Sequence, residues 1–240
     1  MHRRIVVRQR RLHPLVLGAV VLVLATSFAL DTKARPVDPD MLVQQLRDLP
    51  PSIDPGPMEW LCAESRPCPR PISPVEVKRR EIYNQLYALG DAGVSALARG
   101  LKSPDVNLRR NVTTALSALG GGWWFYDRSP AKIDISAALP ALIAALHDPD
   151  PQVRGGAASD LGDVGPRAAA AVPKLVALLS EPDEGLRNNA CIALKGIGPG
   201  AKEALPALRR ALSDPSADVR KFAAFAIESI EGRLRPASSE

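Results

Sequence analysis

The chain offers few residues that could make or break bonds. His147 is the one histidine outside residues 1–30, and it stands beside Asp148 at the expected end of a helix. There a histidine most often complements the helix C-terminus. The sequence has no His-Glu-x-x-His motif and no Cys/His cluster, so we expect neither a metal nor a cofactor. Most carboxylates stand at helix starts, where capping explains them. We therefore expect a protein that is not an enzyme.

The three cysteines and one glycine-rich stretch add little chemistry. Cys62 and Cys68 bracket a short proline-rich loop, and in an oxidising compartment a disulfide between them would close a small ring. Two free thiols are the alternative. Cys191 is best explained as a small apolar filler of a helix. Residues 196–200, GIGPG, lack the preceding strand and the full spacing of a dinucleotide-binding loop.

The basic charge of the chain comes from its N-terminal segment. Residues 1–30 hold five of the 31 basic residues and no acid, so residues 31–240 carry 26 basic and 26 acidic side chains. A body without net charge offers no basic stripe for a phosphate backbone. We therefore expect no nucleic-acid partner.

The N-terminal 30 residues have the pattern of an export signal. A basic stretch with five arginines precedes a 16-residue apolar run, Leu15 to Leu30, which is long for a signal core and short for a membrane span. Ser27 and Ala29 are small residues suited to cleavage after Ala29. A cleaved signal or an uncleaved anchor would contact the membrane and place the body outside the cytoplasm, in the periplasm or cell envelope. A buried core helix is the third alternative.

The body of the chain repeats itself every 33 residues. Ala138-Leu139-Pro140-Ala141-Leu142 returns as 171–175, AVPKL, and again as 204–208, ALPAL. Each unit predicts a first helix with an i, i+3, i+4, i+7 apolar stripe and a proline in its first turn, then a second helix after an Asp-Pro or Glu-Pro pair. Asp150, Asp183 and Ser216 are suited to cap the second helices. A fixed period of this length is typical of a solenoid.

The Asp-Pro-x-x-x-Val-Arg core and the Ala-Leu-Pro-x-Leu opening resemble the HEAT repeat, in the short bacterial form of phycobilisome-lyase-like proteins. The resemblance covers about residues 90–230. It implies an all-α, right-handed superhelical solenoid of helical hairpins whose second helices line a concave face. It also implies ladders between neighbouring units, formed by an acid and the arginine six residues later. By resemblance these structural pairs are Asp148 with Arg154, Glu181 with Arg187, and Asp214 with Arg220.

An earlier unit matches the pattern at a shift of 45 residues, and the excess over 33 is an insertion. The predicted organisation is an export segment or anchor at 1–30, a cap helix and proline-rich loop at 31–73, repeats at 74–230 with the insertion at 121–137, and a polar tail at 231–240. The insertion holds four of the ten aromatic residues in one run, Trp123, Trp124, Phe125 and Tyr126. Two interpretations stay open: the rings pack on the solenoid, or they bind a partner.

The second helix of the unit that follows the insertion carries unusually small residues outside its apolar stripe. Gly155, Gly156 and Gly162 stand there, and each glycine costs roughly 1 kcal/mol relative to alanine. We hypothesise that the insertion or a partner segment lies over Gly155 and Gly156; if a neighbouring helix alone covers them, the hypothesis fails. Later units carry larger residues there, including Asn188, Lys221, Phe222 and Phe225. The two phenylalanines bind a partner or pack under the C-terminal tail.

Together these patterns predict a non-catalytic scaffold of the cell envelope that binds a protein or peptide through its concave helical face, its aromatic insertion, or both. The partner-binding candidates are Trp123, Trp124, Phe125, Tyr126, Gly155, Gly156, Asn188, Lys221, Phe222 and Phe225. The alternative is an enzyme or an accessory subunit, as the resemblance to bilin-lyase HEAT proteins implies. A purely structural envelope protein is a third possibility.

Overall fold

A computed structural model describes residues 37–50, 73–120 and 132–232 of the chain. By its contacts the chain divides into two units, Met1–Val37 and Asp38–Glu240, and the second unit holds every helix discussed below. The predictions for the export segment, for Cys62 and Cys68, and for Trp123, Trp124, Phe125 and Tyr126 lie outside the described residues. No helix of the described part is both long and apolar enough to cross a membrane.

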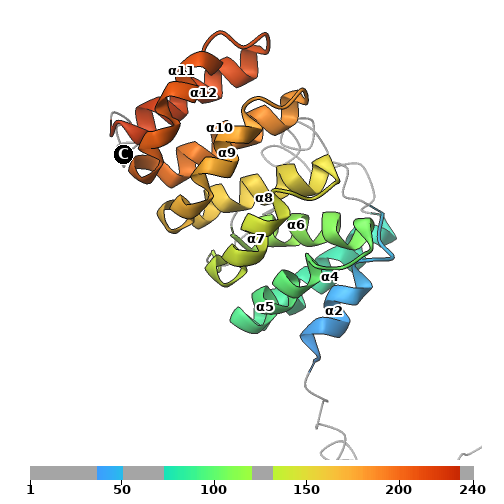
Figure 1. Cartoon of the computed structure of the whole chain (residues 1–240). Coiled ribbons are helices and arrows are strands. Elements are labelled where there is room, and N and C mark those ends of the chain that lie inside the picture. Colours follow the sequence, from blue (N-terminus) through green and yellow to red (C-terminus); the bar gives the residue numbers. More distant parts are fainter. Residues whose placement is uncertain (1–36, 51–72, 121–131, 233–240) are drawn as a thin grey trace, which may run out of the picture. The chain divides into compact units, whose positions relative to one another are not determined.

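The predicted pairs of helices are present in the C-terminal repeats. The first helices are α7 (Leu139–Ala145), α9 (Val172–Leu178) and α11 (Leu205–Ala211). The second helices are α8 (Pro151–Val164), α10 (Glu184–Ile197) and α12 (Ala217–Ile230), and Figure 1 shows the pairs stacked in chain order. All regular structure of the described residues is helical, which agrees with the predicted all-α class.

Short polar and glycine signals set the ends of these helices. The side chains of Asp150, Asp183 and Ser216 accept hydrogen bonds from backbone N–H groups of the first turns of α8, α10 and α12. Gly165 and Gly198 end α8 and α10 at φ of 72° and 65°, a region that strongly favours glycine. Each leads into a 3-10 helix, η2 (Gly165–Ala171) or η3 (Gly198–Ala204), that feeds the next first helix.

Small and branched apolar side chains fill the space between the helices. Of the predicted stripe on α8, Val153, Ala157 and Leu161 are fully buried, and Val164 is nearly so. Cys191 of α10 is also fully buried, and burial raises the pKa of its thiol to about 12. Such a thiol is a poor nucleophile at neutral pH, in keeping with a packing role.

A buried polar cluster joins the N-terminal helices. These are α2 (Pro39–Gln45), α4 (Pro74–Ala88), α5 (Asp91–Gly100) and α6 (Val106–Gly120). Arg79 of α4 donates to Asn111 Oδ1 of α6 at 3.0 Å and to the Pro50 carbonyl at 2.6 Å. Asn111 Nδ2 in turn donates to the carbonyls of Leu46 and Leu49 at 2.9 and 3.0 Å. The cluster therefore ties the chain segment after α2 to both α4 and α6.

Candidate functional site

The second helices form a continuous layer with one side free of the first helices. Helices α6, α8, α10 and α12 contact one another in that order, while α7, α9 and α11 pack on α8, α10 and α12. The stacking is visible in Figure 1. We call the outward side of this layer the second-helix face. The half-buried or exposed residues of these helices include Ser117, Asp163, Lys195, Lys221 and Phe225.

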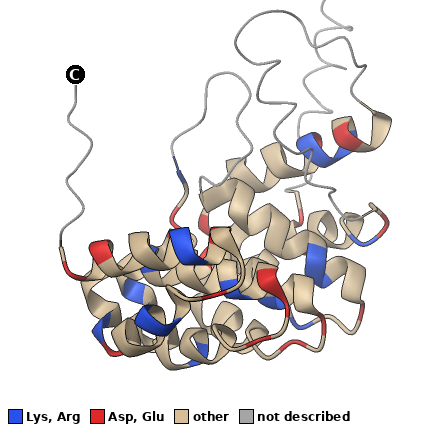
Figure 2. Ribbon diagram, turned by 90° about the horizontal axis from the view of Figure 1, so that it is seen from above, with Lys and Arg blue, Asp and Glu red and all other residues tan. Residues whose placement is uncertain are grey.

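Charged residues are dispersed over the helices. Blue and red ribbon segments alternate in Figure 2, without one large field of either sign. Many of these charges belong to the turns between first and second helices, where arginines and acids pair. The distribution agrees with the absence of net charge in residues 31–240.

The ladder residues pair differently from the sequence prediction. The predicted pairs were Asp148 with Arg154, Glu181 with Arg187, and Asp214 with Arg220. In the structure, Arg187 Nη1 donates to the backbone carbonyl of Glu181 at 3.0 Å, while its Nε and Nη2 bind the carboxylate of Asp214 in the next unit at 2.8 and 3.0 Å. An arginine thus binds the main chain of its own turn and the acid of the following turn.

The same register recurs along the stack. Arg109 binds Asp148 at 2.6 and 3.0 Å, and Arg154 lies 3.7 Å from Glu181. The Arg187 guanidinium lowers the pKa of the Asp214 carboxyl, as expected for a hydrogen-bonded ion pair. With their partners fixed in this way, these side chains hold neighbouring units together.

Neighbouring second helices account for the small size of Gly155 and Gly156. The hypothesis that the insertion or a partner segment lies over them concerns parts outside the described residues and stays a prediction. A Cβ on Gly155 would stand 2.8 Å from Asn189 Nδ2 of α10, and one on Gly156 would stand 2.6 Å from Thr113 Oγ1 of α6. Gly162 similarly faces the backbone of Ala193 of α10 at 3.0 Å. These glycines let α8 approach its neighbours closely.

Two phenylalanines and two lysines gather where α10 meets α12; we call them the Phe/Lys cluster. The rings of Phe222 and Phe225 lie edge to face, 6.2 Å apart at an angle of 80°. Lys195 Nζ of α10 lies 5.9 Å from the Phe225 ring centroid, and Lys221 Nζ lies 6.0 Å from both ring centroids. Within the described chain, neither lysine pairs with an acid. The alternative that the tail covers the rings concerns residues 233–240, outside the described residues.

The remaining candidate on this face is Asn188 of α10. Its side chain is half-buried, and its Oδ1 atom is buried without a hydrogen-bond partner among the described residues. Buried amide oxygens usually accept a hydrogen bond, so Oδ1 of Asn188 is an acceptor that the described residues leave unused. Asn188 lies one helical turn before Ile192, which is half-buried on the same helix.

Sequence reasoning missed a buried carboxyl, Asp160 of α8. Its side chain is fully buried, and its Oδ1 accepts a hydrogen bond from the hydroxyl of Ser117 of α6. Its Oδ2 has no partner in the described part of the chain, and burial raises the pKa of the carboxyl well above its usual range. The signal that could have found it is the repeat itself, since the equivalent residue of the next unit is Ala193.

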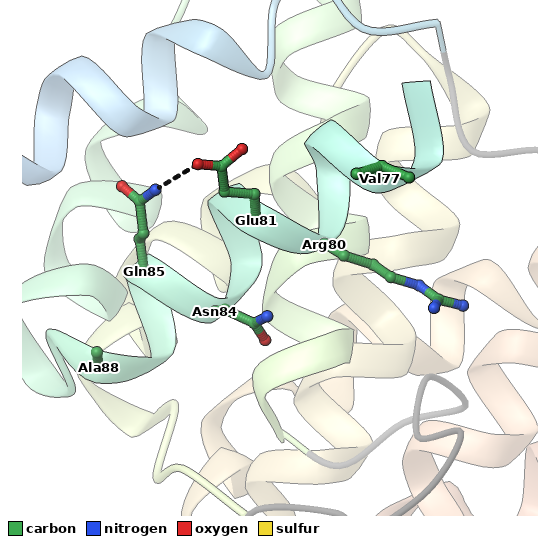
Figure 3. A pocket seen from close by; sticks show the side chains of 6 residues that line it. All are labelled: Val77, Arg80, Glu81, Asn84, Gln85 and Ala88. Atoms are coloured by element: carbon green, nitrogen blue, oxygen red, sulfur yellow. Dashed lines mark hydrogen bonds between the residues drawn. The ribbon is translucent and has the colours of Figure 1, made fainter. Parts of the chain in front are cut away.

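Among the hollows of the described surface, one lies on α4. Its six lining residues all come from this one helix, as Figure 3 shows, so it is an open trough. Gln85 Nε2 donates to Glu81 Oε1 across it at 3.4 Å. A second hollow lies between the α5 end and α7, on the side of the first helices. Neither gathers groups suited to catalysis, and no cluster of described residues could hold a metal ion.

A known family of helical repeats matches the C-terminal part of the chain. Residues 139–231 match the family model of HEAT repeats. The fold is an all-α helical-repeat solenoid of the HEAT/armadillo-like kind. The predicted fold class is therefore confirmed. No curated protein sequence matches the chain significantly.

Solved structures of helical-repeat proteins resemble the chain over most of its length. A designed armadillo repeat protein in complex with the peptide (KR)4 is 19% identical, with a TM-score of 0.54 over 80% of this chain and 81% of that one. The CpcE–CpcF complex of phycocyanin lyase from Nostoc sp. PCC7120 is 24% identical, with a TM-score of 0.50 over 84% and 68%. An engineered protein is 22% identical, with a TM-score of 0.55 over 81% and 80%. At identities this low, the structural likeness shows a shared fold alone.

Proposed function

We propose that this protein is a non-catalytic scaffold that binds a protein or peptide segment along its second-helix face. The observation that carries the proposal is the Phe/Lys cluster. Half-buried aromatic rings lie beside lysines that pair with no acid of the described residues. Such a group combines the apolar anchor and the polar rim of a binding hot spot. Helical-repeat solenoids are typical of proteins that bind extended partners.

The similar structures support binding more than catalysis. The designed armadillo repeat protein holds a peptide, which shows that a stack of this kind can serve as a peptide-binding surface. The likeness to phycocyanin lyase is one of fold, and activity does not transfer with fold alone. The aromatic run Trp123, Trp124, Phe125 and Tyr126 follows directly after α6, so it is the natural candidate to extend the same surface.

We further propose that the scaffold works outside the cytoplasm. The support is the sequence of residues 1–30 alone, with its arginines and its 16-residue apolar run. A reporter enzyme that is active only after export, fused after residue 240, tests this. Activity that disappears when residues 1–30 are deleted supports export, and activity of neither fusion contradicts it.

The binding proposal is tested by capture from an extract of the source cells with matched charge reversals. Lys221→Glu alters the Phe/Lys cluster on α12, while Arg210→Glu makes the same charge change on α11, away from the second-helix face. We expect a partner bound by the wild-type chain and by Arg210→Glu to be lost from Lys221→Glu. Equal capture by all three proteins would place binding elsewhere.

A further inference from the structure

Asp160 stands at a position that the other units fill with alanine. At shifts of 33 and 45 residues its equivalents are Ala193, Ala226 and Ala115, and all three are fully buried. Asp160 is equally buried, so a carboxyl group takes up a place that a methyl group fills elsewhere in the stack.

The hydrogen bonding of Asp160 is incomplete. Ser117 of α6 donates to Oδ1, but Oδ2 is buried and has no partner among the described residues. A buried acceptor left unpaired destabilises the fold relative to an apolar residue of suitable size. Residues that break the local pattern at a cost in stability are concentrated at functional sites.

A second carboxyl lies one turn further along α8. Asp163 is exposed, and its equivalents Ala118, Gly196 and Ser229 carry no charge. A Cβ on Gly120 would lie 3.6 Å from the Asp163 Cβ, which places Asp163 beside the end of α6, where the insertion begins. The two acids that depart from the repeat thus occur together, next to the insertion.

The charged surroundings of this pair are simple. Asp163 acts on Asp160 and helps to raise its pKa. Burial also raises the pKa of Asp163 itself, and the ammonium group of Lys132 acts against that rise. Ser117 is the polar group that faces the pair from α6, and no titratable group of α10 contributes to the raised pKa of Asp160. An ammonium group of the chain itself already acts on the exposed member of the pair.

We propose that Asp163, Asp160 and Ser117 form a recognition site for one cationic side chain, an ammonium or guanidinium group, of the bound segment. Asp163 contacts the cation from the exposed side, and Asp160 supplies the second acceptor through its free Oδ2. An organic cation fits better than a metal ion, because no group of three or more metal-ligating side chains exists among the described residues. This site rests on the proposed function, since it assigns one subsite of the second-helix face.

Binding at this site is coupled to a proton. In the free protein burial favours the protonated form of Asp160, and an arriving cation favours the carboxylate, so the proton leaves Asp160 for solvent. The affinity for a cation therefore rises with pH as Asp160 ionises. By linkage, a variant without the Asp160 carboxyl loses this dependence.

The experiment uses the full chain and the labelled peptide (KR)4 as probe, with affinity measured by fluorescence anisotropy from pH 6 to pH 9. We expect Asp160→Ala and Asp163→Asn each to weaken binding at pH 8 by at least about fivefold, the loss typical of one net hydrogen bond to a charged group. Glu228→Gln, which removes a half-buried carboxylate of α12, is the matched control and should change affinity less than twofold, by about the effect of a distant charge.

Two further readouts separate recognition from folding. Asp160→Ala should melt at or above the wild-type temperature, because alanine fills the same place in the other units, and its affinity should no longer rise with pH. Unchanged affinity in Asp160→Ala, or no binding of (KR)4 by the wild-type chain, would overturn the cation site. Either result leaves the binding scaffold itself intact, since that is decided by capture with Lys221→Glu.

Discussion

Two buried polar residues illustrate opposite outcomes at the residue scale. Asn111 is fully buried, accepts from Arg79 and donates to the carbonyls of Leu46 and Leu49, so its amide is satisfied. Asp160 is equally buried, but one of its oxygens has no partner within the described residues. The first residue should stabilise the stack, while the second should weaken it. Replacing Asn111 should therefore lower the free energy of unfolding, and replacing Asp160 should raise it.

Replacing Asn111 should destabilise the N-terminal helices. Asn111→Ala leaves two backbone carbonyls and one arginine of a buried cluster without their partner, and we expect a loss of about 2–4 kcal/mol in the free energy of unfolding. Urea denaturation followed by circular dichroism measures it. Asn107→Ala, at an exposed position of the same helix, is the control and should change stability by less than about 0.5 kcal/mol.

Replacing Asp160 by alanine should stabilise the protein, by about 1–3 kcal/mol near neutral pH. The pKa of Asp160 is raised in the folded state, so the native chain holds a proton that the unfolded chain releases above about pH 4. Wild-type stability therefore falls as pH rises from there. The gain from Asp160→Ala should be small below pH 4 and should grow above it, and a gain independent of pH would contradict the buried, protonated carboxyl.

At the scale of the element, the arginine ladder joins each turn to the next. Arg187 binds the backbone carbonyls of its own turn and the carboxylate of Asp214. Among the described residues, Arg220 of the last repeat hydrogen-bonds to the backbone carbonyls of Asp214 and Pro215 and to no carboxylate. Comparing the two arginines therefore isolates the contribution of the ion pair between units. The pair is largely buried, with side-chain exposures of 13% for Arg187 and 9% for Asp214.

Arg187→Ala should cost more stability than Arg220→Ala, by about 1–3 kcal/mol at neutral pH, as expected for a hydrogen bond between charged groups. Thermal melts of both variants measure the difference. Arg187 lowers the pKa of Asp214, so the pair stabilises the fold above the unfolded pKa near 4, and this contribution is lost as pH falls through the folded value. Equal losses at pH 7 would show that the ion pair adds nothing.

At the scale of the molecule, most of the fold could be predicted from the 33-residue repeat. Local sequence patterns predict three features: the prolines in the first turns, the apolar stripe on each helix, and the caps at Asp150, Asp183 and Ser216. Together these features define helix pairs that stack in chain order. The ladder register did not follow, because spacing within one unit does not say which neighbour an arginine faces. The close contacts of Gly155 and Gly156 with neighbouring helices could not be predicted either, because small residues make room equally for a helix or for a ligand.

The candidate site was only partly predictable. Lys221, Phe222 and Phe225 were found by comparing equivalent positions of the units, but Lys195 joins them through a contact between two helices. Asp160 could have been found in the same comparison, as an acid among alanines. Its unpaired oxygen depends on the depth of the α6–α8 contact, which the sequence does not give.

The central claim is that a partner lies on the second-helix face. Hydrogen–deuterium exchange of the full chain, free and bound to a partner captured from the source cells, tests it most directly. We expect slower exchange in α8, α10 and α12 on binding, with α9 and α11 unchanged. Protection confined to α9 and α11 would put the partner on the opposite side of the stack and contradict the account.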